Sequence, residues 1–191
     1  MSEPLPPAAK AKRSAPKTPG RRELRKYLDG LGKDELIEQI TQLFADFAPV
    51  REIYQARLSA GDDTATREKY KRIIDKEFRL FGNPRVSTAR KAVLDYQKVA
   101  GSVEGVADLM IHYVERGIAF ASSCGYDVAS FYDSMATMWR NAMLHIQKHD
   151  LQQRFEERCE RVVGLARRCG YGLDSSMESN YFETFDSWEE E

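Results

Sequence analysis

Apolar positions recur at helical spacing in successive segments after residue 20, and no stretch shows the alternation typical of a β-strand. The strongest such segment is Gly105–Cys124, in which apolar residues form two neighbouring rows and leave only a narrow polar stripe. A helix that is apolar over most of its circumference is buried by neighbours on several sides. The sequence therefore predicts an all-α domain with this segment as its central helix.

Shorter amphipathic segments lie on both sides of the central helix. We expect about six main helices joined by short loops, arranged as an antiparallel bundle or as a short stack of helical hairpins. No fixed repeat period decides between these two arrangements. On the first two helices, the apolar residues expected to pack against the rest of the domain are Leu24, Tyr27, Leu28, Leu31, Leu36, Ile37, Ile40, Leu43, Phe44 and Phe47.

The two ends of the chain differ in charge, although the formal net charge is only -1. Residues 1–20 have almost no large apolar side chains, so they bury too little surface to offset the entropy of ordering. We expect a disordered basic tail over 1–20, a helical domain over 21–172, and an acidic, aromatic C-terminal tail over 173–191. The basic residues expected to neutralise the phosphates of a polyanion are Lys10, Lys12, Arg13, Lys17, Arg21 and Arg22.

The C-terminal tail places Tyr181, Phe182, Phe185 and Trp188 on one face of a short helix. Two interpretations are open. The helix folds back over an exposed end of its own domain, or it docks in the apolar groove of a partner. The first interpretation is favoured.

The amino-acid composition is typical of a globular protein of a reducing compartment. Apolar residues make up 42% and charged residues 31% of the chain, as in ordinary globular domains. The three cysteines, Cys124, Cys159 and Cys169, are an odd number without metal-ligand spacing, which is typical of a reducing compartment. No apolar run is long enough to span a membrane. We therefore expect a cytoplasmic protein.

The polar stripe of the central helix is one candidate for chemistry. Asp108, His112 and Glu115 lie on one helical face, where they are spaced to hold a metal or to act as an acid–base group. The favoured alternative is a solvated stripe in which His112 bonds to a carboxylate one turn away. Tyr132 and Asp133 are added as binding candidates, on the hypothesis that Asp133 faces the same groove.

His145 and His149 are four residues apart near the end of a helix. Two histidines at this spacing can share a zinc ion if further ligands are present, but His149 is also placed to interact with the helix dipole. The dipole role is favoured. The sequence contains no phosphate-binding loop, zinc-protease helix or nucleophile elbow. We expect no catalytic residue, no bound metal and no cofactor.

Several stretches resemble a known family. They are LRKYLDGLGKDELIEQITQLFADFAPVREIYQ from Leu24, EKYKRIIDKEF from Glu68, DLMIHYVERG from Asp108, FYDSM from Phe131 and RFEERC from Arg154. Together they resemble an uncharacterised bacterial family, domain of unknown function 6155, over nearly all of the chain after the basic tail. The resemblance implies an α-helical cytoplasmic protein of bacteria. It assigns no activity and transfers no functional residue.

We therefore expect a non-catalytic helical interaction module that binds another protein by a helix face or by its tails. The alternative is a protein that associates with RNA, DNA or the ribosome through the basic tail. A metal-dependent enzyme built on the polar stripe or on the histidine pair is the least favoured hypothesis. No interaction with a membrane is expected.

Overall fold

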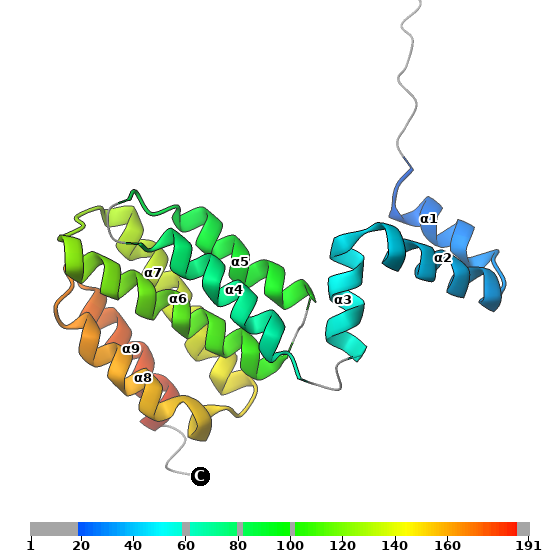
Figure 1. Ribbon diagram of the computed structural model, residues 1–191. Helices are drawn as coiled ribbons and strands as arrows, with labels where there is room; N and C mark the ends of the chain where they lie inside the picture. The colour runs from blue at the N-terminus through cyan, green and yellow to red at the C-terminus, as the bar shows by residue number, and fades with distance from the viewer. Residues whose placement is uncertain (1–18, 59–61, 80–81, 100–101, 187–191) are drawn as a thin grey trace, which may run out of the picture. The chain divides into compact units, whose positions relative to one another are not determined.

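The computed structural model describes residues 19–58, 62–79, 82–99 and 102–186, and over these ranges the chain is helical without a strand (Figure 1). The all-α prediction is confirmed, but the described residues form nine helices rather than about six. The difference comes from three short helices, at the start of the chain, after Phe47 and at the end of the chain. The helices are α1 (Arg21–Asp29), α2 (Lys33–Asp46), α3 (Ala48–Leu58), α4 (Thr64–Glu77), α5 (Val86–Val99), α6 (Val103–Cys124), α7 (Ala129–Lys148), α8 (Gln152–Ala166) and α9 (Leu173–Phe185).

The chain divides into two compact units, residues 1–46 and 47–191. This division differs from the expected one, which placed residues 21–172 in a single helical domain. The boundary lies at Phe47, between α2 and α3. Pro49 lies in the first turn of α3, where its missing N–H costs no helical hydrogen bond.

In the first unit, α1 and α2 bury none of their residues. Within this unit, the apolar side chains of α1 and α2 that were expected to be covered are therefore exposed or half-buried. The two helices meet at the turn around Gly30–Gly32, and Gln39 Nε2 donates a hydrogen bond to Tyr27 Oη over 2.9 Å. Two short helices joined in this way cannot cover their own apolar side chains.

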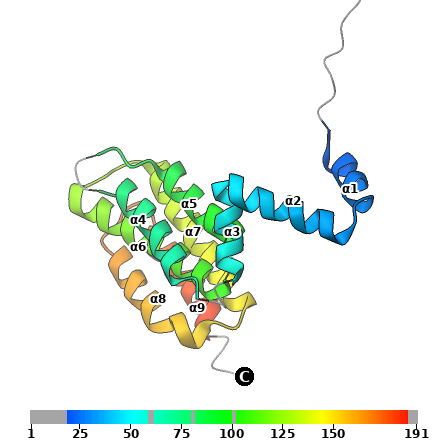
Figure 2. The ribbon, with the colours of Figure 1, turned by 45° about the vertical axis from the view of Figure 1, so that its right-hand side comes forward.

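In the second unit, α6 is the central helix, as predicted, and it packs against α4, α5, α7 and α8 (Figures 1 and 2). The Ser102 side chain caps its first turn by accepting from Gly105 N, at 3.0 Å. Gly125 ends the helix with a left-handed φ of 62°, a conformation that only glycine adopts without strain. Among the described residues, no helix is both long and apolar enough to cross a bilayer.

The last helix, α9, folds back onto α7 and α8. Leu173, Met177 and Phe185 are buried there, and Trp139 Nε1 donates a hydrogen bond to Met177 O over 3.0 Å. The favoured interpretation of the C-terminal segment thus holds for residues 173–186. Trp188 lies outside the described residues.

A buried polar contact joins α4, α5 and α6. Tyr96 Oη and Ser102 Oγ both donate hydrogen bonds to Asp63 Oδ2, and Asp63 is only 8% exposed. Burial, reinforced by the Asp63 carboxylate, raises the pKa of the Tyr96 hydroxyl and keeps it protonated as a donor. The backbone of α6 approaches this contact closely at Gly105, since a Cβ there would lie 1.8 Å from Tyr96 Oη.

We expect the substitution Gly105→Ala to destabilise the protein by about 1–3 kcal/mol, because the added methyl group displaces Tyr96 from Asp63. Gly164→Ala is the matched control, since Gly164 is an exposed helical glycine whose Cβ would meet nothing within 4 Å. The control should gain about 0.5–1 kcal/mol from helix propensity. Urea unfolding of both variants measures the difference, and equal stability would contradict the assigned contact.

Candidate functional site

The polar stripe of α6 lies against α4 and α8, where it forms a cluster of opposite charges rather than a solvated face. Asp108 is 8% exposed and is surrounded by three cations. Lys71 Nζ lies 2.9 Å and Arg67 Nε 3.3 Å from its Oδ2, while Arg158 donates to its Oδ1. We call this group, together with Asp75, His112, Glu115 and Arg116, the charged cluster.

Arg158 of α8 is the cation that joins the two carboxylates of the stripe. Its Nε and Nη2 donate to the two oxygens of Glu115 over 2.8 and 2.7 Å, and its Nη1 donates to Asp108. A bidentate arginine–carboxylate pair is among the strongest polar contacts in proteins. Burial acts to raise the pKa of Asp108, but the hydrogen bonds from Lys71 and Arg158 outweigh it and hold that pKa below its ordinary value.

His112 forms its closest polar contact with α4. Its Nε2 lies 2.9 Å from Asp75 Oδ1, whereas Glu115, one turn away on α6, lies 3.9 Å from Nδ1. Arg116 Nε is 3.0 Å from the same Asp75 oxygen, as an ion pair without hydrogen-bond geometry. Burial lowers the pKa of His112 in spite of these carboxylates. The prediction that His112 bonds to a carboxylate of its own helix is therefore wrong, because Asp75 on α4 lies closer.

The arrangement is suited to holding helices together rather than to chemistry. The positions around Asp108 that a metal ion would occupy are taken by Lys71, Arg67 and Arg158. Over the described ranges, no three His, Cys, Asp or Glu side chains are grouped to bind a metal. Each carboxylate of the charged cluster has a cation or an imidazole from another helix beside it.

The other candidate residues lie away from the charged cluster. The Tyr132 hydroxyl donates to Tyr126 O over 2.8 Å, and its ring stacks on Tyr171 at a centroid distance of 5.0 Å. Asp133 is exposed on α7. The structure thus brings Asp108, His112 and Glu115 together, but gives Tyr132 contacts with none of them.

The histidine pair also has a structural role. His145 Nε2 donates to Val103 O over 2.9 Å, which ties the end of α7 to the start of α6, and the two imidazole centroids are 4.5 Å apart. His149 follows the last residue of α7 as its C-cap. Burial lowers the pKa of His145, which favours the neutral ring in this contact.

The basic tail falls mostly outside the described residues, which include neither Lys10, Lys12, Arg13 nor Lys17. Its last two basic residues, Arg21 and Arg22, are exposed at the start of α1. The tail remains a proposed site for polyanions.

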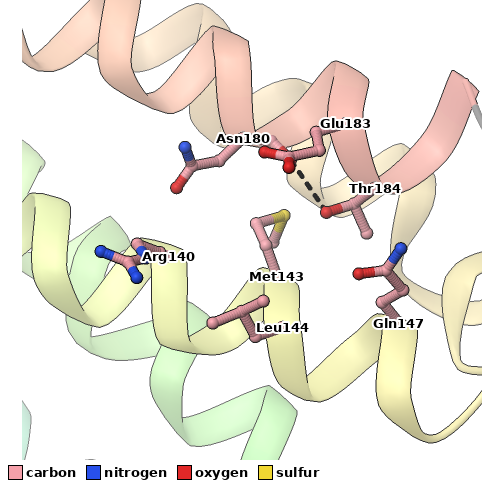
Figure 3. Close-up of a pocket in the computed structure, with 7 residues that line it drawn as sticks. All are labelled: Arg140, Met143, Leu144, Gln147, Asn180, Glu183 and Thr184. Atoms are coloured by element: carbon pink, nitrogen blue, oxygen red, sulfur yellow. Dashed lines mark hydrogen bonds between the residues drawn. The ribbon is translucent and has the colours of Figure 1, made fainter.

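Two hollows on the second unit carry no site. One lies between α7 and α9, where Arg140, Met143 and Thr184 are among its lining residues (Figure 3). Its volume of about 170 Å³ is small, since small-molecule sites measure roughly 300–1,000 Å³.

The other hollow is a cleft of about 380 Å³ at the edge of the charged cluster. Four arginines line it, but each is already paired with a carboxylate. Arg154 binds Glu104 at 2.9 Å and Arg161 binds Glu157 at 2.6 Å, and Arg67 and Arg158 belong to the charged cluster. An anion in the cleft would have to displace these carboxylates.

Sequence reasoning missed the partners of the stripe, although a signal for them exists. Arg67, Lys71 and Asp75 are four residues apart on α4, so they form a charged row of their own. That row faces the row on α6, in which Asp108 and His112 have the same spacing. Pairing the two rows requires knowing that α4 packs on α6.

Comparison with known proteins identifies a family. A family model described as a family of unknown function, DUF6155, matches residues 20–181. Comparison with curated proteins and with solved structures gives no match.

We expect Arg158→Met to cost about 2–3 kcal/mol of stability. The loss is below the 3–5 kcal/mol typical of a broken buried pair, because Arg158 and Glu115 remain 22% and 26% exposed. Arg161→Met on the same helix is the control. Its ion pair with Glu157 is largely exposed, so its loss should cost less than about 1 kcal/mol. Thermal and urea unfolding measure both variants, and a similar small loss in each would refute the structural role of Arg158.

We expect stability to fall as the pH drops below 6.5, the ordinary pKa of histidine. The folded state holds His112 neutral to a lower pH, so the unfolded state binds the proton first and gains free energy. The substitution His112→Gln keeps a donor toward Asp75 and removes this titration. The slope of unfolding free energy against pH just below 6.5 should therefore become shallower by up to about 1.4 kcal/mol per pH unit. An unchanged slope would show that His112 is not held neutral.

Proposed function

The chain belongs to DUF6155, a family of unknown function, and we propose that it is a non-catalytic helical interaction module that binds another protein through α1 and α2. The observation that carries this proposal is the apolar surface of these two helices. We define the apolar face as Leu24, Tyr27, Ile37, Ile40 and Leu43. Each of these side chains is exposed, by 41% to 56%.

All five large apolar side chains of the apolar face are exposed, and they lie on two consecutive short helices. Single exposed leucines are common on protein surfaces, whereas contiguous apolar patches mark interaction sites. Leu24 and Tyr27 follow helical spacing on α1, and Ile37, Ile40 and Leu43 follow it on α2. The apolar face is therefore a stripe on each helix, of the kind that an amphipathic helix places against a neighbour.

The stability of α1 and α2 supports the same conclusion. They contain 9 and 14 residues and bury none of them, and isolated helices shorter than about 12–15 residues are marginal in water. Covering one large apolar side chain contributes roughly 1.5–3 kcal/mol. A partner that covers several members of the apolar face would stabilise both helices.

The absence of a free reactive group in the charged cluster supports a non-catalytic role. A general acid or base must reach a substrate proton, but Asp108 and Glu115 are held by Arg158, and His112 by Asp75. The proposal therefore assigns the charged cluster to stability and the apolar face to binding.

The test compares Leu43→Glu with Leu94→Glu during affinity purification of the full chain from its native cells. Both leucines are 44% exposed on a helix, but only Leu43 belongs to the apolar face. We expect a protein to co-purify with the wild type and with Leu94→Glu, even after nuclease treatment, and to be lost with Leu43→Glu. Circular dichroism checks that both variants remain helical.

Two outcomes would contradict the proposal. Retention of the same proteins by Leu43→Glu would show that the apolar face does not bind them. Loss of all co-purifying protein on nuclease treatment, and on deletion of residues 1–20, would favour the competing proposal of nucleic-acid binding through the basic tail.

A further inference from the structure

The two helices that carry the apolar face have opposite charge. Helix α1 contains four basic and two acidic residues, whereas α2 contains four acidic residues and one basic residue. On α1, Arg21 lies three residues before Leu24 of the apolar face, and Arg25 lies three residues before the half-buried Leu28. On α2, Asp34 lies three residues before Ile37, and Asp46 three residues after Leu43.

A side-chain hydrogen bond links α1 to α2 beside the turn that joins them. Gln39 on α2 holds Tyr27 of the apolar face, and Glu35 Oε2 accepts a hydrogen bond from Gly32 N over 2.7 Å at the start of α2. The first unit therefore carries a basic apolar helix followed directly by an acidic apolar helix. A binding partner must offer apolar surface bordered by acidic groups opposite α1 and by basic groups opposite α2.

A second copy of the chain offers such a surface, because its acidic α2 is complementary to α1 and its basic α1 is complementary to α2. If two copies are related by a two-fold axis that places α1 of one on α2 of the other, unlike charges meet at both contacts. We propose, on the basis of the proposed function, that the apolar face is a homodimer interface in which α1 and α2 of two copies form a four-helix assembly. The alternative in which α1 lies on α1 would place like charges together.

Other occupants fit this surface less well. A nucleic acid or an anionic membrane would attract α1 but be repelled by the four acidic residues of α2. A different protein would need to supply both charge patterns in the same relative positions. The second copy supplies both charge patterns, because it carries the same two helices.

The experiment is a charge exchange on the full chain, read as molar mass by light scattering over a wide range of protein concentration. One variant carries Arg21→Glu and Arg25→Glu, and the other carries Asp34→Lys and Asp46→Lys. We expect the wild type to be a dimer, and each variant alone to dissociate at least about tenfold more readily, because like charges then face each other. Mixing the two variants should restore the dimer, since each supplies the charge that the other lacks.

The control again is Leu94→Glu, which should remain dimeric, while Leu43→Glu should be monomeric. A monomeric wild type at all concentrations would overturn the dimer. If Leu43→Glu still loses its co-purifying protein in that case, the proposed function stands and its partner is a different protein. A dimer that survives Leu43→Glu and both charge variants would also overturn the inference, because its interface would lie elsewhere.

Discussion

The structure of the second unit depends on the need to cover α6 on all sides. Thirteen of the 22 residues of this helix are buried, and four helices pack against it. The apolar rows need only shape and volume from their neighbours, but the polar stripe needs partners of opposite charge. Asp108 sets the strictest condition, since a buried carboxylate without a cation is costly. Helices α4 and α8 meet this condition with Lys71 and Arg158.

The contact around Tyr96 and the charged cluster form one connected network through Arg67. Arg67 Nη2 lies 3.9 Å from Asp63 Oδ1, and Arg67 Nε lies 3.3 Å from Asp108 Oδ2. It thereby links the contact around Tyr96 to the charged cluster. Buried polar groups with specific partners restrict how helices slide and rotate, because a shifted register leaves charges unpaired. We infer that this network fixes the register of α4, α5 and α8 on α6.

The two units differ in how far their apolar side chains are buried. In the second unit, apolar side chains from α4 to α9 pack into one core. In the first unit, two amphipathic helices leave their stripes uncovered. Charged residues that resemble a reactive site in the sequence thus join helices of the second unit, whereas apolar residues of α1 and α2 that resemble a core are exposed. In both cases the role of the residues depends on which helices pack together when the chain folds.

The sequence by itself determined the helical class and the central position of the Gly105–Cys124 segment. These features follow from local periodicity and backbone preference, which need no knowledge of neighbours. It also placed Asp108, His112 and Glu115 on one face. Only the tertiary structure decided that α4 and α8 neutralise this face, because Lys71 and Arg158 are distant from it in sequence. Likewise, periodicity shows that Ile37 and Leu43 share a stripe, but whether another helix of the same chain covers that stripe depends on packing.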